Sequence, residues 1–526
     1  MKKFLALVMA FLLTVSFAGC GGQEKQNINN NTLEIKEPEG NPIKGGTISI
    51  YSYKPDTLCP LLSENNANIR MLNIVYDGLF TIDGNMSVVP CLASSWTALD
   101  NNTRYVVDLK KGVLFHDGSE FNSDDVVFSV KTAISEPNGP FYYNVSMIKE
   151  VKALGTNAVE FTLTKSLAHF VNLLDFPIIK SQAEPVDKSN FIPVGTGGFI
   201  FENRNEGNLF HLVRNNNWWG GEVYLDSVTV RLLPDKDTAV YAFSSGEISL
   251  CPAESDEWGK FVDAQTASYK EYMTEYYNFI GLNHKNILLS KNEVRKALLY
   301  IIDRAEVLKS GVSGFSESTN APVRKNWVYN TAEKGEEEKN SNKARDILED
   351  NGWILQNGLY KKSDRNTTHT LKFEILINEE SYKKEYFAKK VAEELSDFGI
   401  PATVKKLPYD KYTEAINKGA YDMFIGSVNL SKDTDFKFLF GEGNMFFLDD
   451  DELLKCVTDM QYATDEEEFG IKTSEFIKMF NEKVPFIGIG FENSVLLYKS
   501  DIKGEINPIS NNIYNGIEKL YIKEES

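Results

Sequence analysis

The stretch from residue 90 to residue 129, PCLASSWTALDNNTRYVVDLKKGVLFHDGSEFNSDDVVFS, says more about the fold than any other part of the chain. Its middle part alternates apolar and polar residues in two runs separated by a glycine, a pattern typical of strands with one buried face. The apolar residues of the two runs are Tyr105, Val107 and Leu109, then Val113 and Phe115. Asp117 and Gly118 are typical of a tight turn. Ser123 then predicts the N-cap of a helix that begins at Asp124.

This order of elements resembles the signature of the family 5 solute-binding proteins, the extracytoplasmic receptors of oligopeptide, dipeptide and nickel ABC importers. In that family a proline-leucine-alanine-x-x-tryptophan run precedes a pair of strands. A phenylalanine-histidine-aspartate-glycine turn and an aspartate-valine helix follow. The matching residues here are Pro90, Leu92, Ala93, Trp96, Phe115, His116, Asp117, Gly118, Asp125 and Val126. The resemblance implies a binding protein and not an enzyme.

Two later segments resemble further blocks of the same family, in the same order. The second block spans residues 194–250, and its matching residues are Gly195, Thr196, Gly197, Arg214, Asn215, Trp218, Trp219, Gly220, Ser245, Gly246, Glu247 and Ile248. The third block spans residues 279–308, with Val294, Arg295, Ala297, Leu298, Asp303 and Arg304 in matching positions. Three blocks in order make the resemblance extend over nearly all of the chain after the N-terminal segment.

Periodicity predicts alternating strands and helices in the second half of the chain. Residues 371–377, 403–407 and 421–425 alternate as strands, and residues 385–398 and 412–418 repeat apolar residues as helices do. This rhythm is typical of an α/β layer structure. Nearer the N-terminus, residues 69–79 predict a helix that ends at Gly78.

The resemblance implies an α/β protein with a two-lobed, periplasmic-binding-protein-like type II fold, an extra domain and a hinge between the lobes. Single cores stop growing near 250–300 residues, so a chain of 526 residues is expected to form more than one. We expect a discontinuous lobe I, an extra domain inserted in it, and lobe II. The expected boundaries are 44–63, 188–280 and 488–526 for lobe I, 64–187 for the extra domain and 281–487 for lobe II.

The N-terminal residues predict a lipoprotein signal. Lys2 and Lys3 precede an apolar run over residues 4–17, which is too short to span a membrane. Small residues then lead to Cys20, the expected site of lipidation, so residues 1–19 are the expected signal peptide. Residues 20–43 are polar and lack helix or strand periodicity, which predicts a flexible tether. The sequence therefore predicts a protein anchored through Cys20 to the extracytoplasmic face of the cell membrane.

Composition excludes several other classes of function. A formal net charge of −19 argues against nucleic-acid binding, which needs basic surface. No glycine-x-serine-x-glycine elbow and no HExxH helix occurs in the sequence, so a hydrolase is not expected. The remaining cysteines, Cys59, Cys91, Cys251 and Cys456, fit no zinc motif and are interpreted as buried free thiols, with Cys59–Cys91 as the one pairing to check. We expect no cofactor and no metal site.

The resemblance implies a ligand cleft between the lobes, in which a carboxylate neutralises the free amine of a peptide. In oligopeptide receptors this acid lies in a tryptophan-x-x-aspartate-tyrosine run. This chain has Val428 in place of the tryptophan and Ser431 in place of the acid, with Asp433 two residues and Asp435 four residues beyond. Asp433 and Asp435 are therefore candidates for the amine contact. Asn283, at a strand end, and Tyr53, which leaves the first strand, are further candidates for the cleft.

The sequence thus predicts a monomeric receptor that captures a peptide-like solute and delivers it to an ABC permease and its ATPase. Three alternatives share the fold: a nickel receptor, an oligosaccharide receptor and a receptor that signals without transport. The five histidines show no helical ligand spacing, and His284 is the one that a cleft would use for nickel.

Overall fold

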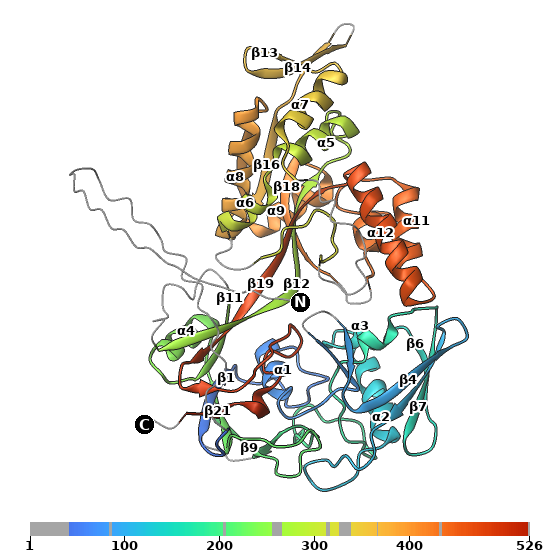
Figure 1. Ribbon diagram of the computed structural model, residues 1–526, viewed down its shortest axis with the longest axis vertical. Coiled ribbons are helices and arrows are strands. Elements are labelled where there is room, and N and C mark those ends of the chain that lie inside the picture. The colour runs from blue at the N-terminus through green and yellow to red at the C-terminus, as the bar shows by residue number, and fades with distance from the viewer. Residues whose placement is uncertain are drawn as a thin grey trace, which may run out of the picture. The chain divides into compact units, whose positions relative to one another are not determined.

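The described part of the chain contains three larger β-sheets and three small ones, together with helices that pack against them (Figure 1). The computed structural model describes residues 42–83, 87–202, 207–254, 266–311, 316–325, 338–364, 367–430 and 434–523, all of which belong to one compact unit, Pro42–Ser526. Cys20, Asp433, the signal sequence and nearly all of the tether predicted from the sequence lie outside the described residues.

The first of the larger sheets has the strand order β1-β10-β9-β8. β1 is parallel to β10, and the other neighbours are antiparallel. Side chains alternate across the sheet, so Ile48 and Ile50 of β1 are fully buried, as are Val228 and Val230 of β10. The strands are β1 (Thr47–Ser52), β8 (Phe199–Glu202), β9 (Leu209–Arg214) and β10 (Ser227–Leu232), and the nearby helices are α1 (Asn66–Leu72) and α4 (Lys236–Ser244).

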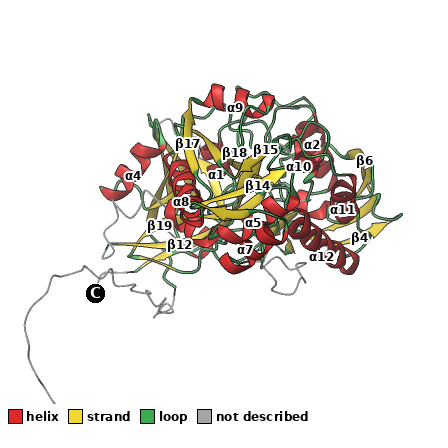
Figure 2. Ribbon diagram, turned by 90° about the horizontal axis from the view of Figure 1, so that it is seen from above, coloured by secondary structure: helices red, strands yellow, loops and turns green. Residues whose placement is uncertain are grey.

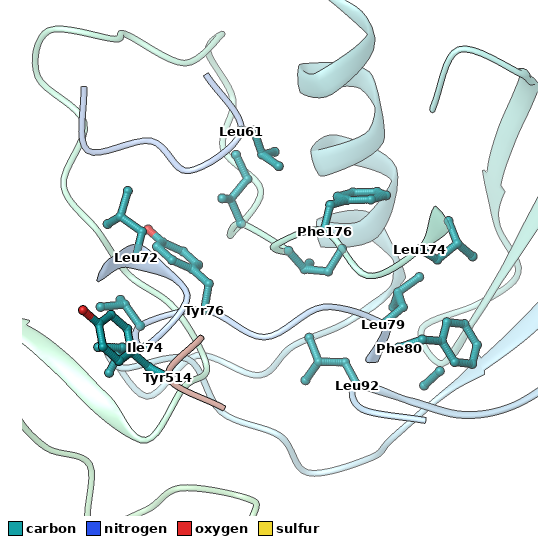
Figure 3. Packing of buried hydrophobic residues seen from close by; sticks show 14 of the residues in the cluster. Leu61, Leu72, Ile74, Tyr76, Leu79, Phe80, Leu92, Leu174, Phe176 and Tyr514 are labelled. Carbon is teal, nitrogen blue, oxygen red and sulfur yellow. The ribbon is translucent and has the colours of Figure 1, made fainter. Parts of the chain in front are cut away.

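The predicted helix over residues 69–79 is wrong in its extent. α1 ends at Leu72, and the chain turns before β2 (Phe80–Ile82), which pairs with β3 (Val88–Pro90). Gly78 does not terminate a helix. Its carbonyl accepts the N–H of Leu92 at 3.1 Å, and a Cβ atom there would lie 2.9 Å from the carbonyl oxygen of Asp175. The glycine lets its own segment and those of Leu92 and Asp175 pack closely. The next residue, Leu79, is one of the buried side chains that Figure 3 labels.

A second four-stranded sheet, in the order β4-β5-β7-β6, contains two strands of the opening stretch, β4 and β5. The predicted strand is confirmed as β5, in which Tyr105, Val107 and Leu109 are buried. Val113 and Phe115 are also buried, but their run is a loop with one isolated bridge instead of a strand. The elements are β4 (Ala93–Leu99), β5 (Arg104–Leu109), β6 (Ile148–Ala153), β7 (Ala158–Leu163), α2 (Ser123–Ile134), α3 (Tyr142–Val145) and the 3-10 helix Phe170–Leu173.

The prediction that Ser123 caps α2 is also wrong. The N-cap is Asn122, whose side chain accepts the N–H of Asp124, while the Asp125 carboxylate accepts the N–H of Asn122 at 2.8 Å. This pair is a capping box, which satisfies donors at the start of the helix from both sides. Ser123 instead donates its hydroxyl to the carbonyl of Gly155 at 2.6 Å.

The largest sheet has six strands in the order β11-β19-β12-β18-β16-β17. Its two longest strands, β12 and β19, run antiparallel side by side over most of their length (Figure 1). The first half of β12 contributes Ala267 and Tyr272 to clusters shared with β1 and α4, while its second half contributes Ile280 and Leu282 to a different core. β12 therefore connects separate hydrophobic cores. The strands are β11 (Leu250–Glu254), β12 (Ala267–Leu282), β16 (Phe373–Asn378), β17 (Ala402–Leu407), β18 (Met423–Asn429) and β19 (Ile487–Lys499).

Helices cover the end of this sheet that contains β16, β17 and β18. β16 is parallel to both of its neighbours, and α8 connects it to β17 as the apolar periodicity predicts. α8 ends at Gly399, whose φ of +101° is the left-handed conformation that favours glycine. Two further helices, α11 and α12, lie side by side (Figure 2). The helices are α5 (Asn292–Ile301), α6 (Arg304–Gly311), α7 (Ser341–Asp350), α8 (Tyr382–Phe398), α9 (Tyr409–Lys418), α10 (Lys437–Phe440), α11 (Asp451–Gln461) and α12 (Glu466–Lys483).

Short elements complete the described residues. A three-stranded sheet precedes β16, and a two-stranded sheet with a 3-10 turn lies near the C-terminus. In the described part of the chain, no helix is long and apolar enough to cross a membrane. These elements are β13 (Ile354–Gln356), β14 (Leu359–Asp364), β15 (Thr367–Thr370), β20 (Ile502–Lys503), β21 (Tyr521–Ile522) and the 3-10 helix Ile517–Lys519.

Candidate functional site

Two adjoining pockets lie beside the middle of β12. The first has a volume of about 720 Å³ and the second about 810 Å³. Both volumes are typical of sites that bind small molecules. The two pockets share three lining residues, Glu275, Ser510 and Asn511, so they are neighbours and are called the groove from here on.

Segments that are distant in the sequence build the groove. The first pocket lies between β2, β12 and the loop over residues 507–515. The second pocket lies between α1, the residues around α3, and the segment that leads from β18 into α10. The groove therefore contacts elements of several cores, with β12 common to both of its halves.

An irregularity in β12 sets the position of Glu275. The register between β12 and β19 shifts between Met273 and Tyr277, and Glu275 lies inside this interval. Thr274 holds the irregular segment, since its hydroxyl donates to the carbonyl of Glu492 at 2.7 Å and accepts the N–H of Tyr276 at 3.2 Å. Such bulges re-aim side chains next to functional sites. Here the bulge brings Glu275 to the junction of the two pockets.

Three charged side chains of the groove lack a charged partner. Within the described residues, Arg70, Lys270 and Glu275 make no ion pair and no side-chain hydrogen bond, although each is only partly exposed. Arg70 comes from the last turn of α1, whose other side is fixed by the buried Asn68, a donor to the carbonyl of Thr57 at 2.6 Å. The groove therefore offers charges of both signs to a ligand.

The other charged groups of the groove are engaged with the chain. Asn493 donates to Glu271 at 2.6 Å, and burial raises the pKa of that carboxyl while the hydrogen bond lowers it. Lys437 donates to the hydroxyl of Tyr462 at 3.0 Å. Arg324 approaches Glu317 at 3.5 Å. These groups contribute to the local field but already have partners.

Aromatic and amide side chains line the rest of the groove. Phe141, Tyr143 and Phe438 line the second pocket, and the last two are each 45% exposed. The amide residues of the two pockets are Asn66, Asn144, Asn429, Asn493, Asn507, Asn511 and Asn515. An amide both donates and accepts, so several such groups suit a ligand with its own amides.

The structure places the candidate residues from the sequence in different regions. Asp435 lines the second pocket, where its Oδ1 atom accepts the N–H of Lys437 at 3.3 Å. Tyr53 lines neither pocket of the groove and packs against Tyr51, with 5.8 Å between the ring centroids. Asp433 and Cys20 lie outside the described residues. Asp435 is thus the described candidate that lies in the groove.

Asn283 lies at the far end of β12, in a separate pocket of about 420 Å³. Its side chain is 4% exposed and bonds three times within the chain. The Nδ2 atom donates to the carbonyls of Gly419 and Tyr421 at 3.0 and 2.7 Å, and Oδ1 accepts the N–H of Lys285 at 3.0 Å. These bonds join the end of β12 to the turn between α9 and β18. A contact between Asn283 and a ligand stays a prediction.

The histidines with candidate roles bond to the backbone. His116 accepts the N–H of Gly195 at 3.2 Å and approaches the carbonyl of Gly197 at 3.0 Å, as a structural role predicts. His284 approaches the carbonyl of Pro485 at 2.8 Å, and burial lowers its pKa to about 4. In the part of the chain that the structure describes, no three histidine, cysteine or acidic side chains gather as a metal site.

The cysteines agree with the interpretation as free thiols. Cys59, Cys251 and Cys456 are buried and Cys91 is half-buried, and all four are free. Burial raises the pKa of Cys59 and Cys251 to about 12, so these thiols are poor nucleophiles.

Comparison with known proteins now decides the family. Residues 87–443, more than half of the chain, match the family of bacterial extracellular solute-binding proteins, family 5 Middle. The chain belongs to family 5 of the bacterial extracellular solute-binding proteins. It is therefore an extracytoplasmic, non-enzymatic substrate-binding protein of an ABC transporter, as the resemblance implies.

Similar family 5 proteins span almost the whole chain. The oligopeptide-binding protein AppA of Bacillus subtilis is 25% identical over 98% of both chains, and its structure with a nonapeptide aligns with a TM-score of 0.62 at 24% identity, covering 92% of this chain and all of that one. The substrate-binding protein CtaP of Listeria monocytogenes has a TM-score of 0.75 at 21% identity, over 92% of this chain and all of that one. NikZ of Campylobacter jejuni, solved with Ni(L-His), has a TM-score of 0.65 at 22% identity, over 90% and 99% of the two chains. The two-lobed α/β fold expected from the sequence is thus confirmed.

Neither Arg70 nor Glu275 is evident from the sequence. Glu275 belongs to the run KEYMTEYYNF, in which polar and apolar residues mostly follow one another in pairs and no residue type marks the position of the register shift. Arg70 belongs to a segment in which the predicted helix is too long. Only the three-dimensional contacts bring these two side chains to one pocket.

Proposed function

We propose that this receptor captures a peptide-like solute in the groove and delivers it to an ABC permease and its ATPase. The observation that supports the proposal is the lining of the groove, where amide side chains and charges of both signs face the same space. A peptide carries amides along its length and charges at its ends, so this lining complements it. Its specificity would come from a few polar groups set among apolar walls.

Amide recognition has one specific support in the first pocket. The buried Oδ1 atom of Asn493 has no hydrogen-bond partner among the described residues, while its Nδ2 atom donates to Glu271. An unpartnered buried acceptor costs free energy, and a ligand N–H would relieve that cost. A main-chain amide of a bound peptide supplies such a donor.

Capture is proposed to shift the protein between an open and a closed form. A ligand that contacts elements of several cores favours the form in which all contacts are made. A micromolar affinity corresponds to about 8 kcal/mol, from which closure is also driven. The proposed lobes are residues 44–63, 188–280 and 488–526 for lobe I and 281–487 for lobe II, with residues 64–187 as the extra domain.

The anchor and the remaining candidate contacts belong to the same proposal. Residues 1–19 would be removed as a signal peptide, Cys20 would carry lipid, and residues 20–43 would form the tether of a monomeric receptor. Asp435 and Asp433 are the candidate acids that the sequence offers for contacts with the ligand, and Asp435 lines the groove. Asn283 and Tyr53 are proposed contacts that lie elsewhere.

A thermal-shift screen tests the proposed cargo. The protein without residues 1–20 is mixed with pooled di- to octapeptides, with oligosaccharides, and with nickel with and without histidine. A ligand at 100 times its Kd adds about 2.7 kcal/mol of stability, which a melting curve detects. Stabilisation by peptides alone is expected. Stabilisation by sugars or by nickel, with none by peptides, would contradict the proposed cargo.

Transport is tested separately from binding. Deletion of the gene should abolish growth on a peptide that the purified protein binds, when that peptide is the sole source of a required amino acid. Normal uptake with an altered transcriptional response would instead identify a sensing receptor. A matched strain that expresses the wild-type protein from a plasmid controls for effects on neighbouring genes.

A further inference from the structure

The second pocket combines two unpartnered charges of opposite sign with an aromatic wall. Arg70 and Glu275 both line this pocket, from α1 and from the bulge of β12. Phe141, Tyr143 and Phe438 line it as well. We infer that Glu275 binds the free ammonium group and Arg70 the free carboxylate of a short zwitterionic peptide, with a bulky apolar side chain against the three rings. The inference rests on the proposed peptide-binding function.

Glu275 suits an ammonium group because its carboxylate forms no ion pair and no side-chain hydrogen bond with the described residues. The nearby cation Arg324 is within reach of the charge of Glu275, but its ion pair, at 3.5 Å, is with Glu317. A half-buried carboxylate gains more from a cation than an exposed one, since water screens the pair less. Its main chain is held by Leu430, whose N–H donates to the Glu275 carbonyl at 2.9 Å.

Asp435 is a weaker candidate for the same ammonium group. One of its carboxylate oxygens accepts the N–H of Lys437, so the side chain is already held by its own loop. Lys437 is also engaged, because its ammonium donates to Tyr462 and lies 4.3 Å from the centre of that ring. The loop thus satisfies its own charges, while Glu275 remains available.

Arg70 suits a carboxylate for a corresponding reason. The guanidinium group has five N–H donors in a planar fork that matches a carboxylate, and within the described residues it has no acidic partner. α1 presents it rigidly, because Ile69 and Met71 on either side of it are buried. Arg70 and Glu275 line one pocket of about 810 Å³. A peptide whose two ends reach both side chains inside this pocket is therefore short.

The three rings that line the second pocket, Phe141, Tyr143 and Phe438, favour an apolar side chain on the bound peptide. Tyr143 and Phe438 are each 45% exposed, so both rings leave apolar area open to a ligand. Burial of such a ring against a ligand side chain stabilises the complex, and the gain scales with the apolar area removed from water. A peptide with phenylalanine is therefore preferred over one with alanine at the same position.

Calorimetry on the protein without residues 1–20 tests the inference. Ala-Phe, Ala-Ala-Phe and Ala-Ala-Ala-Phe are compared as free, N-acetylated and C-amidated forms, together with the corresponding peptides of alanine alone. Either block should weaken binding to the wild type at least tenfold. Glu275→Gln should bind free and acetylated peptides alike, and Arg70→Gln should bind free and amidated peptides alike. Phe438→Ala should remove the preference for phenylalanine.

Matched controls come from α7, whose exposed Glu349 and Arg345 line neither pocket. Glu349→Gln and Arg345→Gln should keep the wild-type discrimination. Unchanged binding of blocked peptides would overturn the inference, and so would loss of amine discrimination in Asp435→Asn instead of Glu275→Gln. If none of these peptides nor any peptide of the screen binds the folded wild type, the proposed function itself is wrong. Melting curves verify that each variant is folded.

Discussion

The carbonyl of Glu275 accepts a hydrogen bond from the N–H of Leu430 at 2.9 Å, one residue beyond the last cross-strand pair of β12 and β18, Tyr276 with Asn429. The main chain of Glu275 is therefore fixed to the segment after β18, while its side chain lines both pockets. A charge that binds Glu275 acts on β12, a strand that contributes residues to separate cores. This position is suited to coupling ligand capture to closure.

The bulge that presents Glu275 depends on Thr274. Replacing it in Thr274→Val removes a hydroxyl that donates to the Glu492 carbonyl and accepts the N–H of Tyr276, with little change in shape. We expect the free energy of unfolding to fall by about 1–2 kcal/mol. Peptide affinity should also fall several-fold, because Glu275 loses its fixed orientation. Urea denaturation and calorimetry measure the two effects.

The control for Thr274→Val is Thr413→Val on α9. The hydroxyl of Thr413, a partly exposed residue that lines neither pocket of the groove, donates to the Tyr409 carbonyl at 2.9 Å. A small stability change and unchanged affinity are expected there. Equal loss of affinity in both variants would show that the bulge has no special part in binding.

Asn283 provides a second prediction. Asn283→Ala leaves the carbonyls of Gly419 and Tyr421 and the N–H of Lys285 without the partners that this buried side chain gives them. We expect a loss of about 2–4 kcal/mol in the free energy of unfolding, measured by urea denaturation. Asn351→Ala, at the exposed end of α7, should cost much less. Peptide affinity of the folded Asn283→Ala variant also tests the predicted ligand contact, and an unchanged value would remove Asn283 from the site.

Regular repeats of apolar residues made much of this fold predictable. β5 and α8 match their predictions closely because long amphipathic patterns specify both a period and a buried face. The helix predicted over residues 69–79 failed because the apolar residues after Leu72 are buried by contacts from distant segments. Leu79 and Tyr76, for example, pack in the cluster that also holds Tyr514 (Figure 3). The spacing of apolar residues along the chain does not distinguish burial on one face of a helix from burial by distant segments.

The site was less predictable than the fold. The family resemblance directed attention to Asp435, which does line the second pocket, but not to Glu275 or Arg70. Glu275 depends on a register shift between strands that are more than 200 residues apart in the sequence. Arg70 depends on where a helix of seven residues ends. Both features arise from tertiary packing, which the order of residue types does not reveal.

The proposed lipid anchor at Cys20 leads to a third prediction. In Cys20→Ala the thiol that would accept the lipid is absent, so the protein should leave the membrane fraction. Two acyl chains give stable anchoring, at roughly 0.8 kcal/mol per buried methylene group, and without them no comparable attachment is expected. Cell fractionation and labelling with a palmitate analogue measure the change, and Cys91→Ala serves as the control. A Cys20→Ala product that still carries lipid and stays on the membrane would contradict the anchor.

A buried carboxyl near the C-terminus predicts a pH dependence. Glu518 lines a pocket of about 270 Å³ with Asp77 and Trp219, and burial, with a smaller contribution from the charge of Asp77, raises the pKa of Glu518 to about 7. In the unfolded chain this pKa is about 4.3. The folded protein therefore holds a proton that the unfolded chain has lost, so this contribution to stability is complete below about pH 4.3 and is lost as the pH rises to about 7.

Glu518→Gln isolates that contribution because glutamine stays neutral at every pH. Relative to the wild type, the variant should gain on the order of 2–3 kcal/mol in the free energy of unfolding between pH 4.5 and pH 7.5. The comparison is needed because His169 and His284, whose pKa values burial lowers to about 4, act in the opposite sense: they destabilise the fold as the pH falls below about 6.5. Urea denaturation across this range gives the difference curve, with the exposed Glu349→Gln as control. A difference between Glu518→Gln and the wild type that stays constant with pH would mean that Glu518 is already ionised in the folded protein.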